Sequence, residues 1–599
     1  MNMSNPFEYI GPEEMTPEQI KQLFVELYSE FPRITRSGNV FITGARGTGK
    51  SMMIRYAMPD VQILINGGRL FSELDYIAFH VKIKRTQINY TDLGVLDDIY
   101  APYYINEHLL TVYVLMFALK SLSELRIKGF RKKSYEKFLN NTYLRYLRLA
   151  NCKDEITPSF ESANAFFNSL YNHAEEMNAQ LISYMASIET KREVSIAPYN
   201  LPLLSFLRFI VPVFSELNKL PGFPKGKDVH IYIDDADYLS ETQTEILNSW
   251  IACRTQPKIS LKIASQNRKY KKYLTPTGVL VEAPHDYYHI NISDIYTTRV
   301  SDYAKKAKSI LEKRLEQADI LCGIQDFFPV YDRQEEGIEG ERQKIREGYP
   351  VSGIGSRVDD DIRRYAIPNY IKSLSGQSKN KMTFRYAGVD NIIHLSSGVI
   401  RYLLEAACDM YDEVEKRLSG EQQITHIPSD IQDDVMRAKA KSYLFNEIYK
   451  LDVAVTDEKD EVAVGYRTKT QRLQNLLRAM GQTFSEILLS ERSERKVFSI
   501  ALSNQVDNDV RETLELGVEL GYLHESRIGN KEGTGQTQLY IMNRCLAPIF
   551  TLDPTGFSGY LFMTNEDLKF AILNGRRLRK VSKHDKSDDQ LSMFKSIEE

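Results

Sequence analysis

The fold is decided early in the chain, by the stretch Gly44-Ala45-Arg46-Gly47-Thr48-Gly49-Lys50-Ser51. This stretch fits the pattern G-x-x-x-x-G-K-[ST], a loop that wraps the phosphates of a nucleoside triphosphate. The glycines let successive backbone N–H groups turn inward, where a β-carbon would block the approach of phosphate oxygens. Lys50 reaches the outer phosphates as a mobile point charge, and the Ser51 hydroxyl is placed to ligate Mg²⁺. The motif therefore predicts ATP and Mg²⁺ as ligands of this loop.

The residues on either side of the loop support the motif. Residues 39–43 read as a short buried strand, and residues 51–58 read as a helix stopped by Pro59. Strand, glycine loop and helix in that order place the phosphates at a helix N-terminus, where the macrodipole favours anions. A glycine-rich turn that matches by accident is the alternative, and the correct flanks argue against it.

Length and composition set the class of protein. A chain of 599 residues exceeds what one hydrophobic core usually organises, so two to four domains are expected. The formal net charge of −3 is not that of a protein that coats nucleic acid, so any DNA contact must come from local patches. The five cysteines are scattered without a C-x-x-C pair, which indicates a reducing compartment. With no signal-peptide pattern and no bilayer-spanning apolar run, we expect a cytoplasmic protein without membrane contact.

Further strands and helices can be placed along the chain. Residues 61–65 and 76–81 look like strands, as do residues 229–233 and 259–264. Between them, from about residue 106 to residue 220, the pattern changes to long amphipathic helices. Strands separated by helices predict an α/β fold, with a parallel sheet interrupted by a helical insertion.

An acidic pair follows the strand at 229–233. Asp234 fits the position that holds Mg²⁺ beside a phosphate loop, and Asp235 fits the position that activates the attacking water. The alternative is a strand that ends in a helix cap, with Asp235 or Asp237 as the N-cap. Capping by Asp237 is compatible with catalysis by its neighbour.

Polar residues also follow the strand at 259–264. A side chain at this place would lie beside the outer phosphate, and we assign this sensor role to Asn267, with Ser265 nearly as suitable. The polarity of an ordinary surface loop is the alternative.

A helix-like stretch at 395–404 contains the step Gly398-Val399-Ile400-Arg401. The ordered set of motifs resembles the AAA+ ATPases of the initiator clade, the origin-recognition-complex type, in a prokaryotic form. By that resemblance a helical lid follows the nucleotide core, and Arg401 is a second sensor that reaches back to the γ-phosphate. The alternative for a lone arginine on a helix is a solvated or salt-bridged side chain. The family also implies an arginine finger from a neighbouring subunit, for which Arg254 and Arg268 are the candidates, and hence a homo-oligomer or a partner protein. Hydrolysing relatives usually carry Glu where this chain has Asp235, which puts the rate of hydrolysis in doubt.

The same resemblance predicts a winged helix after the lid. Residues 507–520 form an amphipathic helix, and residues 522–526 and 538–542 read as a hairpin with Arg527 and Lys531 near its tip. Such a tip would lie along a phosphate backbone. The helix itself is acidic, so docking to a protein is a close alternative to binding double-stranded DNA.

The last residues carry two short signals. Arg576-Arg577-Leu578-Arg579-Lys580 is a basic run suited to phosphates, although a solvated tail is the commoner explanation. Gln590, Leu591, Met593 and Phe594 resemble the short bacterial motif that docks into the sliding clamp of DNA polymerase. Chance is the alternative for so short a match.

These predictions define a domain plan and two functions. We expect a nucleotide-binding core at 1–310 with its insertion at about 106–220, a helical lid at 311–455 with a charged loop at 333–361, a winged-helix-like domain at 456–574 and a disordered tail at 575–599. The first function is a DNA-associated ATPase in replication-linked processes or in defence against mobile DNA. The second is a slow ATP-dependent switch that assembles or controls a protein effector.

Overall fold

The computed structural model describes most of the chain, in two compact units. The described residues are 5–26, 31–83, 102–152, 156–189, 202–253, 258–293, 300–348, 357–375, 383–418, 423–450, 468–490, 496–503, 505–529, 536–555, 559–576 and 578. One unit, called the sheet unit here, comprises Ile10–Gly44 and Thr48–Ile292. The other, called the lid unit, comprises Met1–Tyr9, Ala45–Gly47 and Ser293–Glu599.

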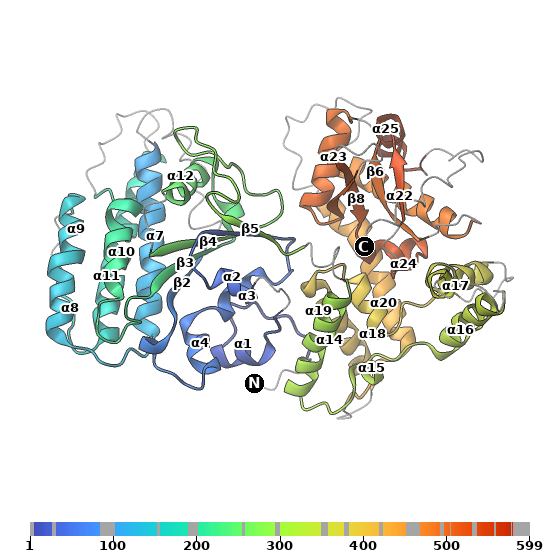
Figure 1. The fold of residues 1–599 in the computed structure, drawn as a ribbon, viewed down its shortest axis with the longest axis horizontal. Helices are drawn as coiled ribbons and strands as arrows, with labels where there is room; N and C mark the ends of the chain where they lie inside the picture. The colour runs from blue at the N-terminus through green and yellow to red at the C-terminus, as the bar shows by residue number, and fades with distance from the viewer. Residues whose placement is uncertain are drawn as a thin grey trace. The chain divides into compact units, whose positions relative to one another are not determined.

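A five-stranded parallel sheet forms the centre of the sheet unit (Figure 1). Its strand order is β2-β3-β4-β1-β5, and every pair of neighbours is parallel. This confirms the predicted α/β fold. The strands are β1 (Val40–Thr43), β2 (Tyr76–Lys82), β3 (Asp228–Asp234), β4 (Ile259–Ser265) and β5 (Tyr288–Asn291).

The short helices of this unit correct one predicted strand. Residues 61–65 do not form a strand but belong to the helix α4 (Pro59–Ile65). Pro59 occupies the first turn of that helix, where its missing N–H costs nothing. Val61 is the residue of this run that is fully buried, against Ile20 of α1 (Pro17–Leu23). The other short helices are α2 (Phe31–Ile34), α3 (Lys50–Tyr56), η1 (Phe71–Glu73), η4 (Ala236–Tyr238) and α12 (Glu241–Ala252).

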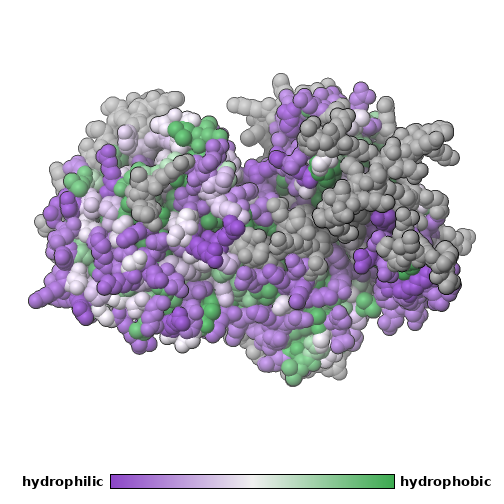
Figure 2. Space-filling model, in the orientation of Figure 1, coloured by the Kyte–Doolittle hydropathy of each residue, from purple (hydrophilic) through white to green (hydrophobic). Residues whose placement is uncertain are grey.

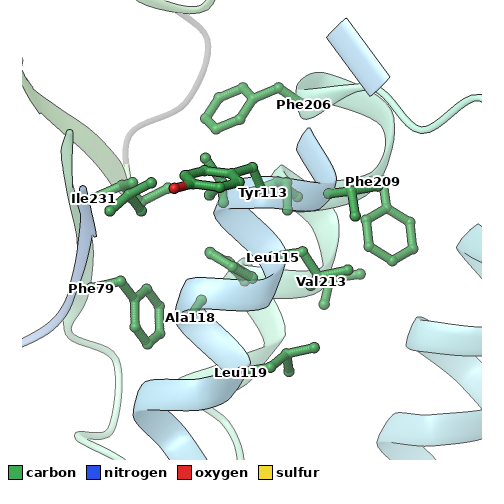
Figure 3. Packing of buried hydrophobic residues seen from close by; sticks show 14 of the residues in the cluster. Phe79, Tyr113, Leu115, Ala118, Leu119, Phe206, Phe209, Val213 and Ile231 are labelled. Carbon is green, nitrogen blue, oxygen red and sulfur yellow. The ribbon is translucent and has the colours of Figure 1, made fainter. Parts of the chain in front are cut away.

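Helices make up most of the described residues between β2 and β3, where the helical insertion is predicted. They are α7 (Pro102–Glu124), α8 (Lys132–Phe138), η2 (Leu139–Tyr143), α9 (Leu144–Leu149), α10 (Ala163–Glu189), η3 (Phe206–Ile210) and α11 (Val211–Leu217). In Figure 1, α7 lies next to the sheet and α8 and α9 lie outermost. Figure 3 shows Leu115 and Ala118 of α7 between the strand residues Phe79 and Ile231 and the side chains of Phe209 and Val213. Burial of a Leu, Val, Ile or Phe side chain contributes roughly 1.5–3 kcal/mol, so this core joins the insertion to the sheet.

Helices also make up the first part of the lid unit. They are α14 (Val300–Gln317), α15 (Ile324–Phe327), α16 (Asp332–Glu347), α17 (Arg357–Ser375), α18 (Val389–Leu395), α19 (Ile400–Arg417), α20 (Ser429–Lys441) and η5 (Ser442–Glu447). The predicted charged loop at 333–361 is therefore wrong over most of its length, because α16 covers 332–347 and α17 begins at Arg357.

The glycines that suggested a loop in this stretch have a different reason. Gly337 lies where α16 packs on α17, and a β-carbon there would overlap the ring of Tyr370. The charged side chains of α16 pair with one another along the helix, as Arg342 and Arg346 do with Glu339. A helix with glycine at its contact face and paired charges outside has the composition of a loop.

The end of the lid unit combines helices with a second sheet. Helix α23 (Asn508–Glu519) precedes the antiparallel hairpin of β7 (Leu523–Gly529) and β8 (Gln536–Met542), in the predicted order. The sheet order is β7-β8-β6-β9, with β6 antiparallel to β8 and parallel to β9. The remaining elements are α22 (Lys469–Leu488), β6 (Val497–Leu502), η6 (Arg544–Leu546), α24 (Ala547–Phe550), β9 (Gly559–Met563) and α25 (Asn565–Asn574).

The predicted tail begins inside the folded part. Leu578 is buried, and its N–H donates to Thr483 Oγ1 at 2.9 Å, so the packed chain extends past residue 575. Lys531 and the clamp-like motif Gln590, Leu591, Met593 and Phe594 lie outside the described residues, and their roles stay predictions. None of the described helices combines the length and the apolar character that crossing a membrane requires.

Two substitutions in α16 test the packing of this helix. Gly337→Ala is expected to destabilise the α16–α17 pair by about 1–3 kcal/mol, because the new methyl group overlaps Tyr370. Gly340→Ala in the same helix meets no atom within 4 Å and is expected to stabilise by about 0.5–1 kcal/mol. Thermal unfolding, together with the rate of protease cleavage within 332–375, measures both effects. Two variants that shift stability in the same direction would show that α16 does not pack through Gly337.

Candidate functional site

The glycine loop joins β1 to α3 in the conformation that the motif requires. Gly47 and Gly49 have φ values of +84° and +101°, which L-residues with a side chain rarely adopt. At Gly44 a β-carbon would lie 3.0 Å from Thr48 Oγ1 and 3.1 Å from Ile292 Cβ, so this position also has no room for a side chain. Lys50 begins α3, is only 6 % exposed, and donates from Nζ to the Gly44 carbonyl at 2.7 Å. The loop is thus closed by its own lysine.

Asp234 is a fully buried carboxylate at the end of β3. His80 Nε2 lies 3.3 Å from its Oδ2, the Ser51 hydroxyl donates to it, and the Lys50 charge is near. Burial raises the pKa of Asp234, but the His80 and Ser51 hydrogen bonds and the Lys50 charge outweigh burial and lower it below its ordinary value. The structure therefore brings together the predicted metal-associated residues, Ser51 and Asp234, with Asp234 in its charged form.

Asp235 sits beside this group in a different environment. Burial and the neighbouring Asp234 charge raise the pKa of Asp235 to about 6, against the opposing charge of Lys82. The Lys82 Nζ is 3.9 Å from Asp235 Oδ2 and is also paired with Glu13. The backbone of Asp235 has φ +55°, a strained conformation for a residue with a side chain. Asp235 is thus the carboxylate of this pair that titrates near neutral pH.

Neither aspartate caps the following helix. Ser240 is the N-cap of α12 and forms a capping box with Gln243. Asp235 precedes η4 but makes no side-chain cap hydrogen bond. Asp237 instead accepts from the backbone N–H and the side-chain amide of Gln266, at 3.1 and 3.0 Å. Asp235 thus holds the N-cap position of η4 without a side-chain cap, and Asp237 connects the end of β3 to the turn after β4.

The predicted first sensor lies in that turn. Ser265 pairs in register with Thr43 at the start of the glycine loop, and it is fully buried. Asn267 follows two residues later, and Arg268 is exposed with φ +57°. Arg254 lies outside the described residues. The sensor role of Asn267 and the choice between Arg254 and Arg268 as the finger stay predictions.

Arg401 lies against the tip of the glycine loop. Its backbone N–H donates to the Gly47 carbonyl at 3.0 Å, and a β-carbon on Gly47 would lie 2.6 Å from Arg401 Cβ. Its guanidinium stacks over the ring of Tyr9 at 4.4 Å and donates from Nη2 to the Tyr9 hydroxyl at 2.8 Å. The structure thus places the predicted second sensor within the lid unit next to Gly47, and it adds a partner that the sequence did not suggest.

Tyr9 is held by an anchored N-terminal segment. Phe7 is fully buried among Phe327, Phe328 and Tyr411. The Asn5 amide donates to Asp412 Oδ1 at 2.7 Å and to the Cys408 carbonyl at 3.0 Å. Further along, Arg314 donates to the backbone carbonyls of Pro6 and Glu8. These contacts fix residues 5–8 to α14, α15 and α19, so the backbone that immediately precedes Tyr9 is held in place.

The strand, the glycine loop, the helix and the buried Asp234 define a P-loop protein of the AAA+ type. The family model described as ORC-CDC6-like matches residues 5–562, so the chain belongs to that family. This confirms the initiator-type AAA+ assignment made from the motifs.

Solved structures similar to this chain carry the same family names at low identity. The Aeropyrum pernix ORC1 protein in complex with DNA is 10% identical, with 90% of this chain and 95% of that chain covered and a TM-score of 0.27. The Aeropyrum pernix ORC2 protein in its ADP form is 12% identical, with coverages of 91% and 95% and a TM-score of 0.28. The Cdc6p protein of Pyrobaculum aerophilum is 12% identical, with the same coverages and a TM-score of 0.26. No curated protein matches the sequence.

Proposed function

We propose that the chain binds ATP with Mg²⁺, hydrolyses it, and acts on DNA in a replication-linked process or in defence against mobile DNA. The buried cluster of Asp234, Ser51, Lys50 and His80 carries the proposal. An ionised carboxylate and a hydroxyl oxygen are ligands that Mg²⁺ prefers, so Ser51 and Asp234 fit the ion. When bound, Mg²⁺ supplies positive charge that stabilises the transferring phosphoryl group. The side chains around it hold those two oxygens in place.

Asp235 is proposed as the group that accepts a proton from the attacking water. Its raised pKa, about 6, suits a general base near neutral pH. The positive charge of Lys82 lowers the pKa of Asp235 and lies 3.9 Å from its carboxylate. This ion pair competes with the attacking water for the carboxylate. An aspartate is also one carbon shorter than the usual glutamate. Both features support slow hydrolysis.

The second candidate function is a slow switch that holds ATP while it assembles or controls a protein effector. The acidic surface of α23 favours it, because this helix precedes the hairpin that would contact DNA. The helix carries four carboxylates and one arginine, a net negative charge that disfavours duplex DNA. Arg472 and Lys469 pair with two of these carboxylates, Asp509 and Glu512, and the other two belong to Glu515 and Glu519. Arg527, exposed on β7, is the residue of the described hairpin that suits a phosphate.

ATP turnover with and without duplex DNA separates the two functions. The wild-type chain is expected to hydrolyse ATP and to change its rate when DNA is added at low salt, where phosphate contacts are strongest. Lys50→Ala is expected to lose nucleotide binding under either function, because the ammonium that meets the phosphates is gone. A DNA-insensitive wild type with no DNA binding at low salt leaves the protein switch as the function. A fully active Lys50→Ala variant would remove the site assignment itself.

The pH dependence of kcat/KM tests Asp235, since this constant reports groups of the free enzyme. Activity should fall below about pH 6, where Asp235 is protonated, and remain level above it. In Lys82→Met this acid limb should move to higher pH, because the lost cation had lowered the pKa. Protonation of the nucleotide itself affects every variant equally, so a difference between two pH profiles comes from a group of the protein. An acid limb that stays in place in Lys82→Met would rule out Asp235 as its source.

The contact between Tyr9 and Arg401 is expected to support the proposed second sensor. Tyr9→Leu removes both the stack and the hydroxyl acceptor and should lower kcat/KM about fivefold to tenfold, given about 0.5–1 kcal/mol for an exposed stack and more for a hydrogen bond to a charged group. Tyr9→Phe keeps the stack but loses the hydroxyl, so its kcat/KM should lie between those of the wild type and Tyr9→Leu. Tyr331→Leu is the matched control, because Arg385 stacks on Tyr331 at 4.1 Å in the same unit. Equal losses in Tyr9→Leu and Tyr331→Leu would show a general effect on folding.

A further inference from the structure

The insertion carries a concentration of positive charge that the nucleotide site does not use. Residues 125–149 contain eight Lys or Arg and one Glu, a net charge of +7 in a chain whose total is −3. The cations are Arg126, Lys128, Arg131, Lys132, Lys133, Lys137, Arg145 and Arg148. All eight residues are exposed. Mutual repulsion among these cations destabilises the folded segment, so the concentration of positive charge calls for an explanation.

Five of the eight cations lie on the exposed side of one continuous helix. Elements α8, η2 and α9 follow one another without a break from Lys132 to Leu149. The opposite side is buried, with the ring of Tyr135 against Phe166 and the ring of Tyr143 against Phe209. In the orientation shared by Figures 1 and 2, the edge of the sheet unit formed by α8 and α9 is largely hydrophilic.

Four of the cations form a straight row, called the basic stripe here: Lys133, Lys137, Arg145 and Arg148. Lys133 and Lys137 are four residues apart, and Arg145 and Arg148 are three apart, so each pair shares a helix face. Arg145 follows Lys137 by eight positions, which overshoots two regular turns of 3.6 residues by nearly one residue. The π-helical turn at Leu139–Tyr143 takes up the extra residue and restores the alignment.

Among the described residues, the four side chains of the basic stripe form no ion pairs, unlike the charged side chains of α16. Within the described part of the chain, no ion pair involves Lys133, Lys137, Arg145 or Arg148, whereas Lys132 lies 3.9 Å from Glu136. On α16, by contrast, Arg342, Lys344 and Arg346 each pair with a glutamate. The exposed residues between the ends of the stripe, Asn140 and Asn141, are also hydrogen-bond donors.

We propose that the basic stripe binds the phosphate backbone of duplex DNA without reading its sequence; this rests on the proposed action on DNA. From residue 133 to residue 148 a helix extends about 20 Å. That length of duplex axis carries about twelve phosphates, at one charge per ~1.7 Å. A row of lysines and arginines that form no ion pair with any described residue, with amide donors between them, matches a rigid rod of uniform negative charge. The same chain presents an acidic α23 beside its hairpin, so the stripe is the better electrostatic surface for DNA.

Salt-dependent DNA binding by the full chain tests the stripe. A fluorescent duplex of mixed sequence is titrated with wild type, with the triple variant Lys133→Gln, Lys137→Gln, Arg145→Gln, and with the matched control Arg342→Gln, Lys344→Gln, Arg346→Gln. The stripe variant should bind at least tenfold more weakly at low salt, and the slope of log K against log salt should fall by about 2.7 for three lost phosphate contacts. The control should bind as the wild type does. The charge-conserving variant Lys133→Arg, Lys137→Arg, Arg145→Lys should also retain binding, and basal ATP turnover should be the same in all of them.

The other outcomes are distinguishable. A wild type that does not bind DNA contradicts the proposed action on DNA. A wild type that binds, with an unchanged slope in the stripe variant, overturns the stripe alone. Leu149, 72 % exposed, lies just beyond Arg148, so anionic lipid vesicles are a parallel probe. Loss of vesicle binding with intact DNA binding in the stripe variant would assign the surface to a membrane and overturn the proposal.

Discussion

The buried charge of Asp234 is the constraint on which the site depends. An ionised carboxylate costs several kcal/mol to bury unless hydrogen bonds and opposite charges compensate. Here the compensation comes from the neighbouring strand, through His80, and from the helix after the glycine loop, through Ser51 and Lys50. The same requirement therefore fixes the spacing of β2, β3 and α3. Asp235, one residue further, lacks the hydrogen bonds from His80 and Ser51, so the two adjacent aspartates have opposite pKa shifts.

The sequence was sufficient wherever the chemistry is local. The glycine loop, the aspartates at the end of β3 and the helix before the β7–β8 hairpin are short-range patterns, and the structure has them as predicted. His80 and Tyr9 could not be found this way, because their partners lie 154 and 392 positions away and only the fold joins them. The errors also have physical causes. The apolar run at 61–65 has the composition of a strand but follows a proline that starts a helix, and the glycines of α16 serve packing rather than a loop.

Charge is distributed unevenly over a chain that is nearly neutral as a whole. The insertion holds a basic stripe, whereas α16 pairs its charges internally and α23 is acidic. The net charge of a protein of this size therefore says little about its partners, because positively and negatively charged surfaces cancel in the total. The basic stripe lies in the helical insertion, where the sequence offered no motif. An insertion held to the sheet by a large apolar core can vary on its outer face without disturbing the nucleotide loop.

The burial of Phe7 has a consequence for the order of events during synthesis. Asn5 and its partner Asp412 are 407 positions apart, and the ring of Phe7 completes its cage only when Tyr411 is present. At ~5–20 residues per second, the ribosome needs roughly 20–80 s to make that stretch. The whole sheet unit is synthesised in this interval and can fold while the segment that precedes it waits. A residue near the start of the chain therefore completes its packing only after the whole sheet unit and most of α19 have been made.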